Sequence, residues 1–264
     1  MLVATVNVNG IRAAVRKGFD RWLLERKVDV VCLQEVRAQD AEIPPEIRDG
    51  WHIAHAEAAA RGRNGVAVFS RIEPTAVRTG IGSKEFDPQG RYIEVDLPGL
   101  TVASLYMPKG EAETDRQVTK ERFMKPFLPY LRALARRAEA ADRDVIVAGD
   151  WNMAHREVDL KNWRGNQKNS GFLPQERAWL DKLYGPRSAY VDVVRSLHPD
   201  ASGPYSWWSY RGRAFDNDVG WRIDHLAVTR RLAARARSAE VDRAATWDTR
   251  FSDHSPVVVD FDVP

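Results

Sequence analysis

The chain has one cysteine, Cys32, in 264 residues and no apolar run long enough to cross a bilayer. A single cysteine cannot form an internal disulfide or a thiolate metal cluster, so we expect neither a disulfide scaffold nor structural zinc. The mean hydropathy is −0.47, and a spanning helix needs roughly 18 apolar residues in succession, so we expect no membrane protein. The first residues also lack the basic start, apolar core and cleavage site of a signal peptide, which favours an intracellular protein.

Positive and negative residues are also nearly equal in number. There are 40 Lys and Arg against 37 Asp and Glu, a net charge of +3. The basic residues comprise 31 arginines and nine lysines. Arginine makes planar, bidentate contacts with phosphate, but it also replaces lysine in proteins from GC-rich genomes. The charge therefore allows a nucleic-acid partner without requiring one.

No linker, repeat or compositional break divides the chain, so we expect one domain over residues 1–264. Apolar or alternating runs predict strands at 2–8, 28–33, 65–69, 92–97, 101–106, 145–148, 223–228 and 256–261. Helical periodicity predicts helices at 11–27, 116–141 and 174–183. Pro98 and Gly99 join two of the strands as an antiparallel hairpin. The pattern indicates a mixed α/β protein with two packed mixed sheets.

Polar side chains recur where an apolar strand ends or begins. They are Asn7 and Asn9, Glu35, Tyr106, Asp150 and Asn152, and Asp253 and His254. If these ends meet at one edge of the sheets, they form an oxygen-rich cleft suited to a hard cation such as Mg²⁺.

Each of these features alone also has an ordinary structural interpretation. Asp150 and Asn152 are typical of a turn that caps its own backbone, and Glu35 of a solvated strand end. Asp224 is less ordinary, because it interrupts an apolar strand where an unpaired carboxylate would be costly. His254 is a natural partner, since a carboxylate fixes the tautomer of an imidazole and favours its charged form.

Taken in order, six motifs resemble the exonuclease III family of DNA-repair nucleases, also called apurinic/apyrimidinic (AP) endonucleases. They are Asn7-x-Asn9-Gly10-Ile11-Arg12, Gln34-Glu35, Tyr106-x-Pro108, Gly149-Asp150-x-Asn152, Trp221-Arg222-Ile223-Asp224 and Ser252-Asp253-His254. The resemblance covers nearly the whole chain. It implies the DNase I-like fold of the endonuclease/exonuclease/phosphatase superfamily, a four-layer α/β sandwich in which two mixed β-sheets pack face to face and are flanked by helices.

The resemblance also implies a reaction: metal-dependent hydrolysis of the DNA phosphodiester 5′ to an abasic site, in base excision repair. Exonuclease activity in the 3′→5′ direction and cleaning of blocked 3′ ends would accompany it. By position, Asp150 would orient or deprotonate the attacking water, with Asn152 helping to hold it. Asp224 would hold His254 against the scissile phosphate, and Tyr106 would contact that phosphate or assist the leaving oxygen.

For the metal, the resemblance implies Glu35 as the principal Mg²⁺ ligand, with Asp253 nearby and Asn7 and Asn9 completing the set. Mn²⁺ is expected to substitute. A second metal site at Asp150, Asn152 and His254 stays open, because one-metal and two-metal mechanisms use the same ligands. Asn9 stands where one branch of the family has aspartate, so we expect weaker Mg²⁺ binding.

Seven residues match family positions that contact substrate. Three would form an apolar pocket for an extruded abasic sugar: Trp207, Trp221 and Ile223. Four would contact backbone phosphates or enter the helix near the lesion: Arg37, Arg91, Lys109 and Arg211. Core packing and solvated surface charge are the ordinary alternatives, and Lys109 departs from the amide usual at its position.

We therefore expect a monomeric enzyme of the compact bacterial type, in the cytoplasm and associated with the nucleoid, whose partner is double-stranded DNA with abasic or blocked 3′ ends. Two alternatives remain. A phosphoesterase could use a similar core on a small molecule or lipid headgroup, and a DNA-binding protein without activity would have lost a residue such as Glu35 or Asp150.

Overall fold

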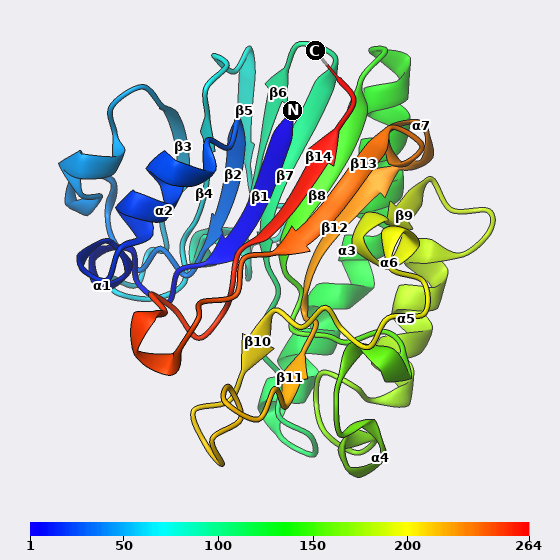
Figure 1. The fold of residues 1–264 in the computed structure, drawn as a ribbon. Coiled ribbons are helices and arrows are strands. Elements are labelled where there is room, and N and C mark those ends of the chain that lie inside the picture. Colours follow the sequence, from blue (N-terminus) through cyan, green and yellow to red (C-terminus); the bar gives the residue numbers. More distant parts are fainter. Residues whose placement is uncertain (264) are drawn as a thin grey trace.

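Two six-stranded mixed sheets pack face to face in the structure, a computed structural model that describes residues 1–263 (Figure 1). The first sheet has the order β13 (Ala236–Val241), β14 (Val257–Phe261), β1 (Leu2–Asn7), β2 (Val30–Gln34), β4 (Val66–Ser70) and β3 (His52–Ala56). The second has the order β5 (Ala76–Thr79), β6 (Tyr92–Leu97), β7 (Leu100–Tyr106), β8 (Asp144–Asp150), β12 (Asp224–Thr229) and β9 (Tyr190–Asp192). Strands β10 (Trp207–Trp208) and β11 (Gly220–Trp221) form a separate ribbon.

Each sheet has one parallel pair at its centre. Strands β1 and β2 are parallel in the first sheet and β7 and β8 in the second, and the other pairs are antiparallel. The predicted hairpin is confirmed, because β6 and β7 pair antiparallel with Leu97 opposite Leu100. Gly99 has a φ of 67°, a left-handed conformation that glycine adopts without a steric penalty.

The helices are α1 (Ile11–Arg16), α2 (Phe19–Arg26), α3 (Asp115–Ala140), α4 (Trp163–Asn166), α5 (Pro174–Tyr184), α6 (Val193–Leu197) and α7 (Arg230–Ala233). The predicted helices at 116–141 and 174–183 agree with α3 and α5 to within a residue at each end. The prediction of one helix over 11–27 was wrong. Gly18 has a φ of 103°, which cannot continue a right-handed helix, so the segment folds as α1 and α2.

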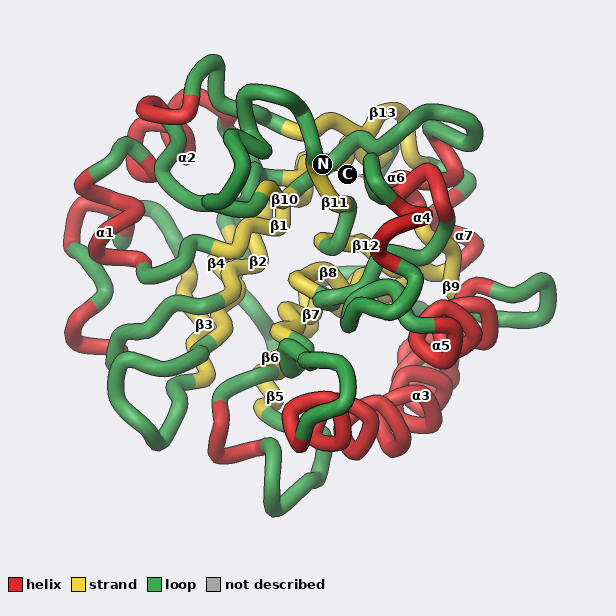
Figure 2. The backbone as a smooth tube through the Cα atoms, turned by 90° about the horizontal axis from the view of Figure 1, so that it is seen from below, coloured by secondary structure: helices red, strands yellow, loops and turns green. Residues whose placement is uncertain are grey.

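The fold has four layers, as the family resemblance predicts. Figure 2 shows the molecule from below the view of Figure 1. In it, α1 and α2 lie outside the first sheet, and α3 and α5 lie outside the second. One apolar core fills the space between the two sheets. A second core lies between the first sheet and its helices, and a third between the second sheet and its helices. A strand such as β8 is buried on both faces, which explains its continuous apolar sequence.

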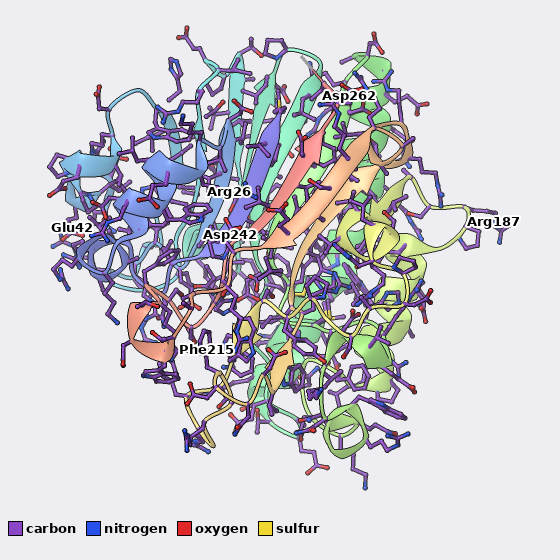
Figure 3. All side chains as sticks on the ribbon, viewed as in Figure 1. Arg26, Glu42, Arg187, Phe215, Asp242 and Asp262 are labelled. Carbon is purple, nitrogen blue, oxygen red and sulfur yellow. The ribbon has the colours of Figure 1, made fainter. Side chains whose placement is uncertain are left out.

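The eight predicted strands are all present, shifted by at most about two residues at their ends. The strands that the patterns missed are short or lie at sheet edges: β3, β5, β9, β10, β11 and β13. A surface contact joins α2 to the residue that follows edge strand β13, where Arg26 Nε donates to Asp242 Oδ2 at 2.9 Å (Figure 3). Within residues 1–263, none of the helices combines the length and apolarity that crossing a membrane requires.

Candidate functional site

The polar strand ends meet at one end of the sandwich, the lower end of the two sheets in Figure 1, above β10 and β11. Asp150 ends β8 and lies opposite two residues in the sheet register, Tyr106 at the end of β7 and Asp224 at the start of β12. In the facing sheet, Asn7 ends β1 beside Gln34, the last residue of β2. The convergence predicted from the sequence is therefore confirmed.

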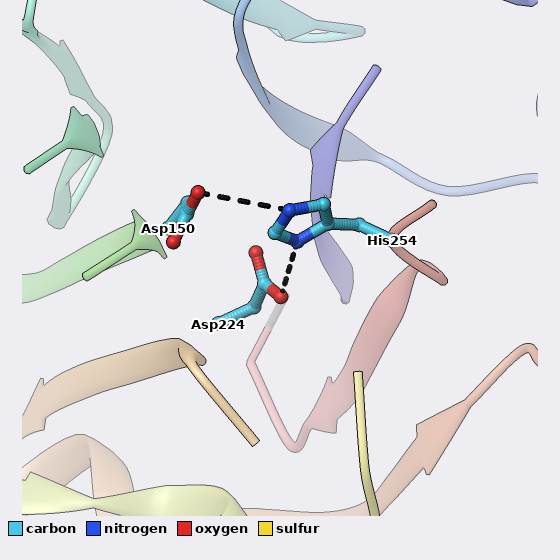
Figure 4. A group of neighbouring side chains, drawn as sticks. All are labelled: Asp150, Asp224 and His254. Atoms are coloured by element: carbon cyan, nitrogen blue, oxygen red, sulfur yellow. Dashed lines mark hydrogen bonds and ion pairs between the residues drawn. The ribbon is translucent and has the colours of Figure 1, made fainter. Parts of the chain in front are cut away.

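Asp224 is paired with His254, as its place in an apolar strand predicts. Its Oδ2 lies 2.8 Å from His254 Nδ1 (Figure 4) and accepts a hydrogen bond from the Ser206 hydroxyl at 2.6 Å. On the other side of the ring, His254 Nε2 is 3.8 Å from Asp150 Oδ2. With Asp224 accepting the Nδ1 proton, Nε2 is the imidazole atom that faces Asp150.

These buried charges shift one another's protonation. Burial opposes the charged imidazole, but the negative charges of Asp224 and Asp150 outweigh it and raise the pKa of His254. Burial raises the pKa of the Asp150 carboxyl; His254 opposes this shift and the charge of Asp224 adds to it. The arrangement thus favours an imidazolium beside a carboxylate of increased basicity.

Asp150 is held by three hydrogen bonds. The backbone N–H of Asn152 donates to Oδ1 at 2.9 Å, and the side-chain amide of Asn7 donates to Oδ2 at 2.9 Å. The Asn152 amide also donates to Oδ2 at 3.4 Å and to the Met107 carbonyl at 2.9 Å. Donors on both oxygens fix the carboxylate plane, so its direction is set before any ligand binds.

Gly149 is required immediately before this aspartate. A Cβ at that position would lie 2.0 Å from the Leu105 carbonyl oxygen of the neighbouring strand. Real Cβ atoms do not approach a backbone oxygen so closely, so any other residue would force β7 and β8 apart. The glycine lets β8 reach the site in register with Tyr106.

The predicted metal ligands lie next to this group. The Asn7 amide donates to Glu35 Oε1 at 2.9 Å as well as to Asp150, so one side chain connects the two carboxylates. Asp253 accepts from the Asn9 amide at 2.8 Å and from Trp207 Nε1 at 3.1 Å. Glu35 and Asp253 both line the same pocket.

The donor chemistry fits a hard divalent cation. Glu35 and Asp253 offer carboxylate oxygens in a pocket without sulfur ligands, which is the set that Mg²⁺ prefers. Asp224 Oδ1 is buried and lacks a hydrogen-bond partner within the described residues. The ligand atoms of Asp150, Asp224 and His254 also lie within 4.8 Å of one another, so the second predicted site stays a prediction.

The pocket has a cavity volume of about 230 Å³. Its apolar walls are the three predicted residues, Trp207, Trp221 and Ile223, and the two indole rings meet edge to face at 6.3 Å. An isolated β-bridge pairs Trp207 with His254, which fixes this wall beside the imidazole. Buried Phe172 belongs to the same apolar cluster as these three walls.

The four predicted basic residues differ in their placement. Lys109 is exposed and lines the pocket, with Nζ 5.7 Å from the Trp207 ring centroid. Arg37 is hydrogen-bonded to Glu35. The guanidinium of Arg91 lies over the Tyr106 ring and donates to the Tyr106 carbonyl at 3.3 Å. The fourth, Arg211, is on an exposed loop and does not line the pocket. Only Lys109 is thus presented directly to a ligand in the pocket.

A buried ionic network supports the pocket from within the protein. Arg222, between Trp221 and Ile223 in the chain, bonds Asp159 at 2.8 Å and Asp192 at 2.7 Å. Burial opposes ionisation of these carboxyls, but the charge of Arg222 holds the pKa of both well below its usual range. The paired charges fix the segment that carries the pocket walls.

The sequence reasoning missed Ser206, whose hydroxyl bonds Asp224. A serine before two tryptophans gives no signal of this contact, which joins residues 18 positions apart. It also missed the loop formed by Asn169, Ser170 and Gly171, which closes one side of the pocket. Asn169 and Ser170 give no signal beyond a polar, turn-like composition.

Comparison with known proteins identifies the family that the sequence motifs resemble. Residues 4–254 match the model of the endonuclease/exonuclease/phosphatase family. The chain is 36% identical over 258 residues to an exodeoxyribonuclease of Bacillus subtilis, covering 97% of this chain and 98% of the relative. It is 32% identical over 280 residues to exodeoxyribonuclease III of Haemophilus influenzae, covering 99% of this chain and all of the relative.

Solved structures agree over the full length. An AP endonuclease from Archaeoglobus fulgidus superposes with a TM-score of 0.88 at 29% identity, and both chains are covered completely. The 3′ phosphatase NExo from Neisseria, bound to a product DNA hairpin, superposes with a TM-score of 0.88 at 28% identity, again with complete coverage. The chain belongs to the endonuclease/exonuclease/phosphatase family, on the branch that its exodeoxyribonuclease and AP endonuclease relatives share.

Proposed function

We propose that this DNA-repair nuclease hydrolyses the phosphodiester 5′ to an abasic site with Mg²⁺ and leaves a 3′-hydroxyl. Removal of 3′ nucleotides and of 3′-blocking groups uses the same site. One observation carries the proposal: the buried pair of Asp224 and His254 faces Asp150 in a pocket whose walls are Trp207 and Trp221.

Asp150 is the base that orients and deprotonates the attacking water. Burial raises the pKa of its carboxyl, which strengthens it as a proton acceptor. The Asn152 N–H and the Asn7 amide fix its two oxygens. The carboxylate therefore meets the water without reorganising, which lowers the barrier to attack.

His254 and Tyr106 stabilise the phosphate as negative charge develops on it. Asp224 holds the Nδ1 side of the imidazole at 2.8 Å, so the Nε2–H of the imidazolium is available to a phosphate oxygen. Burial raises the pKa of the Tyr106 hydroxyl, and the charges of Glu35 and Asp150 add to the shift. Tyr106 thus stays protonated and acts as a hydrogen-bond donor.

Glu35 and Asp253 would hold the cation, with Asn7 and Asn9 fixing their orientation. Mg²⁺ bound there supplies Lewis-acid stabilisation of a phosphate oxygen, and Mn²⁺ can substitute for it. The Asn7 amide bonds both Glu35 and Asp150, which supports a cation site beside the base.

Selectivity for damaged DNA comes from the pocket. Its volume of about 230 Å³ and its indole walls suit a deoxyribose without a base, whereas a normal nucleotide would have to fit its base as well. Lys109 at the pocket, with Arg37, Arg91 and Arg211 around it, supplies contacts to backbone phosphates that carry no sequence information. The substrate is accordingly double-stranded DNA with an abasic site or a blocked 3′ end.

The proposal treats residues 1–264 as one domain that acts as a monomer. Its support is that both sheets contribute to one site, Asn7 and Glu35 from the first and Asp150 from the second. A chromosomal DNA substrate places the enzyme in the cytoplasm with the nucleoid.

The test is incubation of the purified protein with a labelled duplex that carries one abasic analogue, beside an undamaged duplex, in Mg²⁺ and in EDTA. We expect metal-dependent incision 5′ to the lesion. Asp150→Asn and His254→Ala should abolish cleavage and leave binding of the abasic duplex largely intact. Retained turnover by purified Asp150→Asn would refute the mechanism, and wild-type protein that binds both duplexes without cutting either would indicate a binding protein. If the wild-type protein neither cuts nor binds either duplex, small phosphoesters become the substrates to test.

A further inference from the structure

We propose that Lys109 makes the site selective for a 3′-terminal phosphate monoester over an internal phosphodiester. The inference rests on the proposed function and names the residue that would set the balance between two of its reactions.

The pocket holds three carboxylates and two cations: the His254 imidazolium, which is paired with Asp224, and Lys109. Glu35, Asp150 and Asp253 line it, and Lys109 is the single lysine or arginine among the lining residues that the structure describes. No carboxylate within residues 1–263 forms an ion pair with the Lys109 ammonium. Its Nζ lies over the Trp207 ring, 5.7 Å from the ring centroid. This cation is therefore free to pair with an anionic ligand.

The two substrates differ at the atom beyond the reacting phosphorus. In both, water attacks phosphorus and the bond to the 3′-oxygen breaks, with a proton taken up by that oxygen. In an internal diester the phosphorus is joined through a bridging 5′-oxygen to the neutral abasic sugar. In a terminal monoester the corresponding oxygen is unbridged, and the product released is inorganic phosphate. The monoester carries close to two negative charges at neutral pH, because its second pKa is about 6, whereas the diester carries one.

Lys109 lines the pocket that receives this variable group. Trp207, which lies against its ammonium, is the wall that an abasic sugar would contact. A neutral sugar beside Trp207 is not attracted to the ammonium, whereas a negatively charged terminal phosphate oxygen at the same place is. Three carboxylates line the pocket, and its imidazolium is already paired with Asp224. A dianionic ligand is therefore the one that depends most on the Lys109 ammonium.

The test compares wild-type protein, Lys109→Gln and Lys109→Arg on two duplexes. One carries a 3′-phosphate at a nick, and the other an internal abasic analogue. We expect Lys109→Gln to lower kcat/KM for the 3′-phosphate about tenfold more than for the abasic site, the order expected for one unit charge near a partly solvated phosphate. Lys109→Arg should keep the wild-type ratio. Lys125→Gln, which removes an exposed charge on α3, should change neither rate.

A second readout does not need the metal-loaded enzyme. In EDTA, fluorescence anisotropy should show Lys109→Gln binding a 3′-phosphate end about tenfold more weakly relative to a 3′-hydroxyl end than wild-type protein does. This difference should shrink as salt rises, since Lys109 is exposed.

Equal losses on both substrates, or no loss on either, would overturn the inference while leaving the proposed function standing. Failure of the wild-type protein to process either duplex would instead refute the proposed function, and the inference with it.

Discussion

Replacing Asn9 by aspartate should make the folded protein depend on its metal. In the structure the Asn9 amide donates to Asp253 Oδ1 at 2.8 Å, and Trp207 Nε1 donates to the other oxygen at 3.1 Å. The amide thus satisfies the Asp253 carboxylate without a cation. An aspartate at position 9 would instead place two carboxylate oxygens in contact.

The size of the effect follows from this geometry. The substitution removes a hydrogen bond to a charged group, worth about 1.5–3 kcal/mol. It also adds a like-charge contact worth about 4 kcal/mol at 4 Å near a protein surface. Side-chain rearrangement and proton uptake relieve part of the repulsion, so we expect the free energy of unfolding in EDTA to fall by about 3 kcal/mol. For a chain of this size that lowers Tm by about 6–12 °C.

Mg²⁺ should reverse the loss, because the added carboxylate is a further ligand for a hard cation. Differential scanning fluorimetry in EDTA and across an Mg²⁺ titration measures both effects. Saturation at about 100 times Kd contributes about 2.7 kcal/mol, so Asn9→Asp should recover most of its deficit at a lower Mg²⁺ concentration than wild-type protein needs for its own shift. Asn9→Ala, which removes the hydrogen bond without adding charge, is the control and should show a smaller loss and no such recovery. An Asn9→Asp protein as stable as wild type in EDTA would refute the reasoning.

Three further outcomes are expected. Gly149→Ala places a Cβ 2.0 Å from the Leu105 carbonyl oxygen and should lower the free energy of unfolding by about 3 kcal/mol; a change within about 0.5 kcal/mol in urea unfolding would contradict the steric account. Burial opposes ionisation of Asp159 and Asp192, but the arginine between them holds the pKa of both well below its usual range. Their folded pKa values lie below the unfolded value of about 3.9, so their stabilisation is present above that pH and is lost as pH falls below it; denaturant midpoints unchanged from pH 7 to pH 3 would contradict this. Trp221→Ala should lower the rate of abasic incision more than the rate at which intact 3′ nucleotides are removed. Equal losses of the two activities in a gel assay would show that Trp221 acts only in core packing.

The sequence predicted most of the fold because buried strands carry a continuous pattern. Strand β8 is buried throughout and apolar from Val145 to Ala148, so its run could not be mistaken for a loop. Edge strands lack that pattern. Strand β5, for example, reads Ala-Val-Arg-Thr and is partly exposed along its length, and its pairing with β6 depends on the sheet rather than on its own residues.

The break between α1 and α2 shows a different limit. The apolar spacing continues across Gly18, because both helices pack against the same sheet. Periodicity therefore favoured one helix, and only the backbone conformation of Gly18 separates them. A glycine within a helical pattern is tolerated often enough that the sequence alone does not mark the break.

At the site, the sequence predicted which residues converge but not which atoms bond. Polar residues at the ends of some strands and at the starts of others identify the edge, since an antiparallel strand begins where its neighbour ends. The contact between Asn7 and Asp150 spans 143 residues and joins two sheets, and nothing local to either residue specifies it.

That contact also explains why the face-to-face packing matters for chemistry. Each sheet alone fixes only its own residues: β1 and β2 bring Asn7 beside Glu35, and β8 and β12 bring Asp150 beside Asp224. The apolar core between the sheets sets the distance between these two halves, and the Asn7 amide bonds both carboxylates, one in each half. A change in the inter-sheet core that moved the sheets by 1 Å would therefore separate the cation site from the base while leaving every site residue in place, and a displacement of that size is enough to cost catalysis about 100-fold.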